Sequence, residues 1–361
     1  MKILLISNMY PDKTNPAFGI FVKRSVDILV ENGNEVKLVV MYKKRGKIKK
    51  VLSYIMHYFS VIKEVIRADY DIVYVHFASL NAIPVLIAQT FKQKIKIITN
   101  VHGGDVVPEK GIAHLFQPFV KRLLHVSDKV IVPSDYFKEL VQSKYALKND
   151  IHISPSGGID PTVFFVESPD YSTFDLSEQY KYVGYVGRID YGKGWDIFLE
   201  AISLVKQEVQ REDIKYIIVG NGSQYQQLQS DIESKNLLND IILIDLLSQD
   251  KLQKLYNVID VLIFPTTRQG ESLGLVGLEA MACGTPTIGS RIGGLKSYIE
   301  DGVNGFLFEP GNAVELKQKL VYYYNLSENE ISEIEENALR TIDKFSRNYV
   351  KNQFKDIFNI S

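Results

Sequence analysis

Short apolar runs rich in β-branched residues alternate along the chain with segments whose apolar positions recur at helical spacing. In the first half the runs cover residues 2–7, 35–40, 71–76, 94–101 and 129–134, and helix-like segments such as 135–144 follow them. The runs are apolar at consecutive positions, as strands are when helices cover both faces of their sheet. The pattern predicts an α/β fold built on a parallel sheet.

The same pattern starts again after a polar stretch at residues 165–179. Apolar runs now occupy residues 182–187, 215–220, 240–245, 260–265, 285–290 and 305–310. We therefore predict two doubly wound parallel-sheet domains with a boundary near residues 160–180. Right-handed crossovers would place the loop after every strand at one edge of its sheet, where ligands of such folds bind.

Composition is that of an ordinary globular protein, with 361 residues of which 45 % are hydrophobic and 24 % charged. This length suits two domains better than one core. Cys283 is the only cysteine, which excludes an intramolecular disulfide framework, and no early segment has the order of a signal peptide. Polar residues interrupt the apolar stretch 75–91, so it does not resemble a membrane span. We expect a cytoplasmic protein.

The charge is distributed unevenly. Residues 1–160 contain 23 Lys and Arg against 14 Asp and Glu, whereas the remainder contains 19 against 29. The two halves either meet different partners or attract each other across a cleft, and composition does not decide between these interpretations.

Two glycine-containing loops follow predicted strands. In "YVGRIDYGKGWDIFLEA" (185–201) a strand ends at Gly187 and Arg188, and Lys193 follows before an apolar-periodic helix. Two cations and exposed backbone N–H groups at a helix start are typical of a metal-free diphosphate site, although the cations could instead be solvated on a loop. In "VGNGSQYQQL" (219–228), Gly220 and Gly222 match part of a dinucleotide fingerprint and are weak alone.

Two glutamates flank the start of another helix in "RQGESLGLVGLEAMACGTP" (268–286). Glu271 precedes the helix that begins near Gly274, so it can accept hydrogen bonds from sugar hydroxyls. The N–H groups of the first turn, at Leu275 and Val276, can face a phosphate. The helix is apolar nearly all round and should be buried, so Glu279 needs donors. Ribose hydroxyls, a structural arginine or backbone N–H groups could supply them.

The order of these motifs resembles a known family. "VHGGD" and "SPSGGID" precede "GRIDYGKG", "VGNGS" and "GESLGLVGLEAMACGTPTIGSRIGGLKSYIEDGVNGFLFEPGN" along essentially the whole chain. This series is similar to the retaining, nucleotide-sugar-dependent glycosyltransferases of family four, which have the GT-B architecture of two Rossmann-like domains. The resemblance implies an acceptor-binding domain at residues 1–165 and a nucleotide-sugar-binding domain at residues 175–340. It also implies that residues 341–361 form a helix crossing back to the first domain.

The resemblance also implies roles for individual residues. Arg188 and Lys193 would bind the donor diphosphate, Glu271 the donor sugar and Glu279 the ribose. His102 in "HGGD" would lie at the sugar or acceptor, and we interpret the other five histidines, His76 among them, as structural. Gly19 would approach the reaction centre, but "NPAFGIF" has only this glycine where the family usually has a pair. The full set of predicted site residues is His102, Arg188, Lys193 and Glu271 for catalysis and Gly19, Gly187, Gly220, Gly222, Gly274, Leu275, Val276 and Glu279 for the donor.

The expected activity is transfer of a sugar, with retained anomeric configuration, from a nucleotide sugar to a glycan or lipid-linked glycan. A UDP-sugar is the expected donor. The "P…GIFVK" opening is similar to members that build bacterial surface polysaccharides. Two alternatives stay open: a UDP-sugar 2-epimerase-like enzyme, which has no acceptor, and a non-catalytic GT-B scaffold subunit.

No cofactor or metal is expected. The "DYD" at residues 69–71 matches the metal-binding pair of the other main glycosyltransferase fold, but it precedes its strand and lies at the edge away from the other motifs. A glycoside hydrolase is not expected either. It would need two carboxylates about 5–9.5 Å apart, and it would have no use for the cationic glycine loop.

A basic segment, "KKRGKIKK" (43–50), precedes a stretch whose apolar positions 51, 52, 55, 56, 59, 62 and 66 recur at helical spacing. An amphipathic helix with such a flank can bind the anionic inner face of the cell membrane as a peripheral element. A core helix after a solvated loop fits the same spacing equally well. Nucleic acid is not expected as a partner, because no aromatic side chains are interleaved with the charges.

Overall fold

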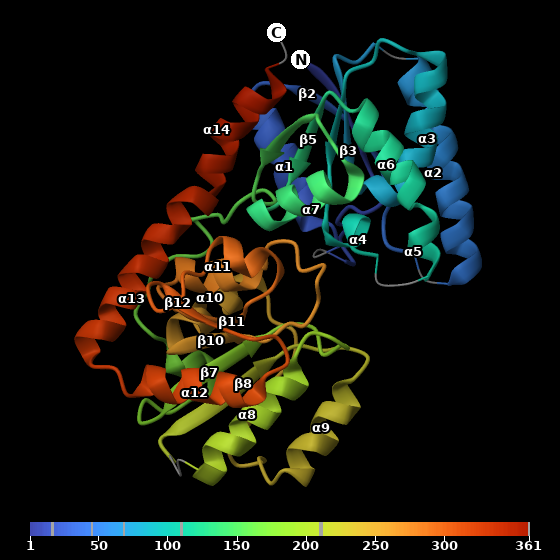
Figure 1. Cartoon of the computed structure of the whole chain (residues 1–361). Helices are drawn as coiled ribbons and strands as arrows, with labels where there is room; N and C mark the ends of the chain where they lie inside the picture. The colour runs from blue at the N-terminus through green and yellow to red at the C-terminus, as the bar shows by residue number, and fades with distance from the viewer. Residues whose placement is uncertain (16–17, 45, 68, 109–110, 209–211, 360–361) are drawn as a thin grey trace. The chain divides into compact units, whose positions relative to one another are not determined.

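The computed structural model of the chain describes residues 1–15, 18–44, 46–67, 69–108, 111–208 and 212–359. It divides into two compact units, the first formed by residues 1–158 and 347–361 and the second by residues 159–346. The contiguous part of the first unit thus ends at residue 158 and the second unit at residue 346, whereas the sequence predicts domain ends at 165 and 340. Figure 1 shows the order of helices and strands within each unit.

The first unit contains a six-stranded sheet in the order β2-β1-β3-β4-β5-β6, and every neighbouring pair is parallel. Its strands are β1 (Lys2–Ser7), β2 (Glu35–Val40), β3 (Ile72–His76), β4 (Ile97–Asn100), β5 (Lys129–Val132) and β6 (Asp150–Ile153). Its helices are α1 (Ile20–Glu31), α2 (Lys47–Arg67), α3 (Ala78–Phe91), α4 (Gly103–Val106), α5 (Gly111–Leu115), α6 (Gln117–Val126), α7 (Asp135–Tyr145) and α14 (Arg347–Phe358). The predicted strands are confirmed, and β6, which the pattern did not predict, extends the sheet at one edge.

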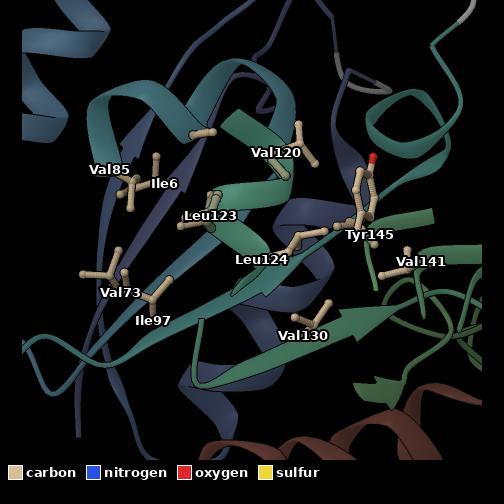
Figure 2. Close-up of a cluster of buried hydrophobic side chains, with 14 of the residues drawn as sticks. Ile6, Val73, Val85, Ile97, Val120, Leu123, Leu124, Val130, Val141 and Tyr145 are labelled. Atoms are coloured by element: carbon tan, nitrogen blue, oxygen red, sulfur yellow. The ribbon is translucent and has the colours of Figure 1, made fainter. Parts of the chain in front are cut away.

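Alternate side chains of this sheet enter two different cores, as the period of two in a strand requires. One face of the sheet carries Leu4, Ile6, Val73, Val75 and Ile97, which pack with α2, α3, α6 and α7. Figure 2 shows part of this core, with Leu123 and Leu124 of α6 above the strands. The opposite face carries Ile3, Leu5, Ile72 and Tyr74, which pack with α1 and with Val350, Phe354, Ile357 and Phe358 of α14.

The second unit contains a second six-stranded parallel sheet, in the order β12-β11-β10-β7-β8-β9. Its strands are β7 (Lys181–Val186), β8 (Ile214–Val219), β9 (Ile241–Ile244), β10 (Val261–Phe264), β11 (Thr287–Ser290) and β12 (Gly305–Phe308). Its helices are α8 (Trp195–Glu208), α9 (Tyr225–Ser234), α10 (Gln249–Val258), α11 (Leu275–Ala282), α12 (Ala313–Tyr324) and α13 (Glu328–Thr341), with the short helices η1 (Tyr171–Phe174), η2 (Gly293–Ser297) and η3 (Ile342–Phe345).

The strand order of this unit is that of a Rossmann fold. Counted within the unit it reads 6-5-4-1-2-3, so the winding direction reverses between β7 and β10. Both units are therefore α/β domains of the predicted class. In such a sheet, ligands bind outside the carboxyl ends of the strands at the reversal point. A ligand-binding site is therefore expected at the loops after β7, β8 and β10.

No helix among the described residues is both long and apolar enough to cross a bilayer.

Candidate active site

Three loops meet at the carboxyl edge of the second sheet, because they follow the neighbouring strands β10, β7 and β8. The loop after β7 lies between the other two. On one side the Thr267 backbone N–H donates to the Gly192 carbonyl at 3.0 Å, and on the other the Gln224 N–H donates to the Ile189 carbonyl at 2.9 Å. This loop carries the predicted cations, so its neighbours fix the positions from which those side chains extend.

Close backbone approach explains two of the predicted glycines. A Cβ at Gly220, whose φ is +145°, would lie 1.8 Å from the Gly187 carbonyl oxygen, and one at Gly222 would lie 2.2 Å from that of Ile189. A Cβ at Gly187 would meet the Tyr185 hydroxyl at 3.1 Å. The structure therefore gives these glycines a role in packing the loops together. Their predicted contact with the donor stays a prediction.

Lys193 and Glu271, predicted to serve different parts of the donor, form an ion pair. The Lys193 Nζ lies 2.8 Å from Glu271 Oε2, and the two side chains are 20 % and 14 % exposed. The Thr266 hydroxyl is 3.4 Å from the same oxygen. The backbone of Glu271 is anchored by hydrogen bonds to the Arg268 carbonyl and from the Gly294 N–H, at 3.0 and 2.9 Å. The carboxylate is therefore held between β10 and η2.

Arg188 pairs with Asp190 two residues further on, but its side chain is 71 % exposed. Asp190 is buried, and the Ser223 N–H and hydroxyl both donate to its Oδ1 at 2.8 Å. Burial alone would raise the pKa of Asp190, but these hydrogen bonds and the charges of Arg188 and Arg268 outweigh it and lower the pKa. Asp190 thus stays ionised and tethers a cation that remains open to solvent.

Arg268 is a third cation at this edge, and it is not among the site residues predicted from the sequence. Its Nη2 and Nε donate to the Tyr191 carbonyl at 2.9 and 3.2 Å, which ties the loop after β10 to the loop after β7. A signal was present, since Arg268 lies two residues before Gly270 at the start of the motif that carries Glu271. Three cations and two carboxylates therefore share this edge of the sheet.

Helix α11 begins at Leu275, as predicted, with Gly274 as its N-cap at φ +84°. Gly274 offers no side chain to cap the helix, and no acidic residue lies in the first turn. The N–H groups of Leu275 and Val276 belong to that turn, which has no partners for them within the helix and favours an anion. The geometry is therefore suited to a phosphate.

Glu279 lies one turn further along α11 and is 8 % exposed, in a helix that is otherwise almost entirely buried. The Tyr256 hydroxyl is 3.5 Å from its Oε2. The predicted burial of this helix is confirmed. Contact of Glu279 with a ribose stays a prediction.

His102 lies in the first unit, directly after β4, as the N-cap of α4. It is 6 % exposed, and the rings of Phe21 and Phe77 lie 4.7 and 4.6 Å from its ring. Its backbone N–H donates to Asp105 Oδ2 at 3.0 Å. Burial lowers the pKa of His102 to about 3, so the imidazole is neutral.

His76 at the end of β3 is the partner of His102, which the sequence did not indicate. Its Nδ1 lies 3.2 Å from His102 Nε2, and the two rings are stacked with centroids 5.5 Å apart. The other nitrogen of His76, Nε2, is buried without a hydrogen-bond partner within the described part of the chain. His76 is thus a core residue that contacts a predicted site residue.

Gly19 is the N-cap of α1 at φ +77°, and a Cβ there would lie 2.8 Å from the Met9 carbonyl carbon. Its conformation and close approach both require glycine. Pro16 and Ala17 of the same motif lie outside the described residues. Of the predicted site residues, Gly19 and His102 belong to the first unit and the other ten to the second.

The "DYD" aspartates lie at the amino end of β3, as the sequence indicated. Asp69 pairs with Lys92 at 3.3 Å, and Asp71 accepts a hydrogen bond from the Lys2 N–H at 2.7 Å. Within the described ranges, no group of three His, Cys, Asp or Glu side chains lies close enough together to hold a metal ion.

Two family models match the chain. Glycosyl transferases group 1 matches residues 172–340, and Glycosyltransferase Family 4 matches residues 23–215, which is more than half of the sequence. The chain belongs to glycosyltransferase family 4. This confirms the family indicated by the motifs, and the two parallel-sheet units are the two domains of the GT-B architecture.

Curated relatives of this family 4 glycosyltransferase extend over most of its length. An uncharacterized glycosyltransferase of Methanocaldococcus jannaschii is 28 % identical over 91 % of the chain and 90 % of its own length. The N-acetyl-alpha-D-glucosaminyl L-malate synthase of Bacillus anthracis is 26 % identical over 71 % of the chain and 65 % of its own length.

Solved structures agree on the fold. Sucrose-phosphate synthase from Thermosynechococcus elongatus superimposes with a TM-score of 0.81 at 18 % identity, over 99 % of this chain and 98 % of that one. Anabaena HepE in complex with UDP and glucose superimposes with a TM-score of 0.76 at 18 % identity, over 99 % of both chains.

Proposed function

We propose that this family 4 glycosyltransferase moves a hexose from a UDP-sugar to a hydroxyl group of a glycan or lipid-linked glycan, with retention of configuration. The observation that carries the proposal is the gathering of Arg188, Lys193 and Arg268 at one sheet edge. The second unit as a whole has 16 Lys and Arg against 29 Asp and Glu. Cations concentrated at the carboxyl edge of an acidic domain are suited to a diphosphate.

Different residues of the second unit would bind different parts of the nucleotide-sugar donor. Arg188, Lys193 and the first turn of α11 would compensate the charge that develops on the departing diphosphate, without a metal or cofactor. Glu279 would accept hydrogen bonds from the ribose and Glu271 from the sugar. Because Lys193 is paired with Glu271, donor binding would exchange this ion pair for one contact to phosphate and one to sugar hydroxyls.

The comparisons support a surface-glycan role by similarity. Among the curated relatives, the lipopolysaccharide 1,2-N-acetylglucosaminetransferase of Salmonella typhimurium is 27 % identical over 56 % of this chain and 54 % of its own length. Anabaena HepE has also been solved in complex with UDP-glucose. We therefore propose UDP-sugars as donors and cell-surface polysaccharide synthesis, at the cytoplasmic side of the cell membrane, as the setting.

A thermal-shift screen over UDP-, GDP- and ADP-sugars tests the donor. A ligand at ~100 times its dissociation constant adds about 2.7 kcal/mol to stability, which is a readily measured shift. Stabilisation by UDP-sugars alone is expected, and stabilisation by another nucleotide class would contradict the UDP assignment. Proton NMR of the glycoside formed from the active donor then reports its anomeric configuration, and inversion would contradict retention.

The same measurements separate the alternatives. A 2-epimerase-like enzyme would convert the nucleotide sugar in the absence of any acceptor. A scaffold subunit would bind no nucleotide sugar at all.

A further inference from the structure

Helix α2 in the first unit has a buried face that includes a histidine, and it exposes several large apolar side chains to solvent. His57, Val61 and Val65 are the residues it buries. Six large apolar residues are at least 48 % exposed, namely Ile48, Val51, Leu52, Ile55, Met56 and Phe59. The interpretation as a core helix is wrong for five of the predicted apolar positions, namely Val51, Leu52, Ile55, Met56 and Phe59.

The six exposed residues form one face of the helix, because their spacing of three and four residues repeats the helical period. We call them the α2 apolar face. From Ile48 to Phe59 the face runs for roughly 17 Å at 1.5 Å per residue. The orientation of the helix is fixed from within, since the His57 Nε2 lies 2.9 Å from the Asn81 Oδ1 of α3 in a buried contact. This buried contact fixes the rotation of α2 about its axis. The apolar face is therefore held toward solvent.

A groove lies beside this face. It has a volume of about 670 Å³ and lies between α2 and the edge strand β2. Leu38, Val40, Leu52 and Met56 supply apolar walls, and three lysines and one glutamate also line it, namely Lys37, Lys44, Lys49 and Glu64. The apolar surface of α2 thus continues into a groove whose charged lining residues are mostly cations.

The chain segment that carries the face is strongly basic. Residues 36–63 contain eight Lys and Arg and no Asp or Glu. Lys43, Lys44, Lys47, Lys49 and Lys50 are exposed, and none of them pairs with a carboxylate in the described part of the chain. Arg45, which belongs to the same basic segment, lies outside the described residues.

We propose that the α2 apolar face and its flanking lysines dock this enzyme on the surface of an anionic lipid bilayer. Exposed Met, Phe, Leu and Ile side chains on one helix face can enter the boundary between headgroups and acyl chains, while the lysines at the helix start contact anionic headgroups. A symmetric contact with a second copy would bring the same patch of unpaired cations against itself, which charge repulsion opposes. An anionic surface supplies the complementary charge.

The inference deepens the proposed function, because it would place an enzyme acting on a lipid-linked glycan at the surface that holds its acceptor. It rests on residues of the first unit outside the predicted donor site, so the two proposals can fail separately.

Co-sedimentation with vesicles tests the docking surface. Phosphatidylcholine vesicles with and without 30 % phosphatidylglycerol are compared for the wild type, for M56Q/F59Q and for a variant with Lys43, Lys44, Lys47, Lys49 and Lys50 changed to Gln. The control is L238Q/K251Q in the second unit, where Leu238 is 64 % exposed and Lys251 is exposed.

The wild type and the control should bind anionic vesicles only, and less at high salt. Both α2 variants should bind at least tenfold more weakly. Equal binding by the variants, or no binding by the wild type at physiological salt, would overturn the proposal. So would concentration-dependent self-association of the wild type that M56Q/F59Q abolishes, because the face would then join two copies.

Stabilisation by UDP-sugar, measured on the same preparations, should be identical in all four proteins. Failure of the wild type to respond to any nucleotide sugar would contradict the proposed function and leave the vesicle result unaffected.

Discussion

The Lys193 ammonium group lies 2.8 Å from the Glu271 carboxylate. The two residues come from different loops, after β7 and after β10, so the pair joins two sides of the predicted donor site. In the proposed function, a diphosphate and a sugar would compete for these two charges.

Replacing Lys193 by Ala should lower kcat/KM by roughly 10²–10³, as loss of a single charge-stabilising donor does. It should also lower the free energy of unfolding by about 1–2 kcal/mol, because Glu271 is left mostly buried without its partner. K193A/E271Q should recover that stability without recovering activity. Kinetics and urea unfolding of the single and double variants provide the measurement.

Arg188→Ala should give a similar loss of transfer with almost no loss of stability. The Arg188 side chain is 71 % exposed, and Asp190 keeps its two hydrogen bonds from Ser223. Near-wild-type turnover in both R188A and K193A would contradict the diphosphate assignment of this loop.

The two glutamates should respond differently to two ligands. Glu279→Gln should weaken the binding of UDP and of UDP-sugar alike, because both contain the ribose. Glu271→Gln should weaken the binding of UDP-sugar but not that of UDP, because only the former has the sugar and because loss of the Glu271 charge leaves Lys193 free for the diphosphate of both. Isothermal titration with both ligands measures this, and a uniform effect of E271Q would argue against a sugar contact.

Gly220→Ala should destabilise the second unit by roughly 2–4 kcal/mol, since the new Cβ would clash with the Gly187 carbonyl. Gly302→Ala is the matched control. Gly302 also has a positive φ, of +81°, but has open space around it, so its loss should be about 1 kcal/mol. Chemical denaturation compares them. Equal effects would mean that the loop after β8 shifts to make room.

Stability of the first unit should fall on acidification. The pKa of His102 is lowered to about 3, and that of His76 lies well below its ordinary value. Between pH 6.5 and 3 the unfolded chain therefore binds more protons than the folded unit, and stability falls as the pH falls. For His102 this amounts to roughly 4–5 kcal/mol at most. Asp105 acts in the opposite direction between about pH 6 and 4, since burial raises its pKa to about 6.

His102→Gln should therefore make the pH dependence shallower, as measured by urea unfolding at pH 7, 5.5 and 4.5. His125→Gln, at an exposed position of α6, is the control and should leave the slope unchanged. A wild-type slope equal to that of H102Q would mean that His102 titrates freely.

Transfer should survive chelation, because cations of the chain are proposed to compensate the diphosphate. Activity with excess EDTA measures this directly. Complete loss of transfer that manganese restores would contradict this and would favour a metal site at Asp69 and Asp71.

The strands, both sheets and the start of α11 could be predicted from sequence, because consecutive apolar runs and capping glycines are local signals. Strand β6 was missed because "DIHI" is short, alternates polar with apolar residues and lies at a sheet edge. The contact of His76 with His102 depends on the parallel register of β3 and β4, which pairs His76 with Asn100, and no local pattern encodes it. Periodicity along α2 defines a stripe equally well whether that stripe faces the core or the solvent, so the helix could not be oriented from sequence.

Helix α14 completes the core of the first unit with Val350, Phe354, Ile357 and Phe358, yet it follows the entire second unit in the chain. During synthesis, residues 1–158 therefore have α1 on this sheet face but lack the Phe354 and Phe358 rings that pack against Tyr74, until the ribosome has made the whole second unit. At about 5–20 residues per second this delay lasts on the order of 10–40 seconds. The second unit is contiguous in the chain, so its core can be complete before that of the first.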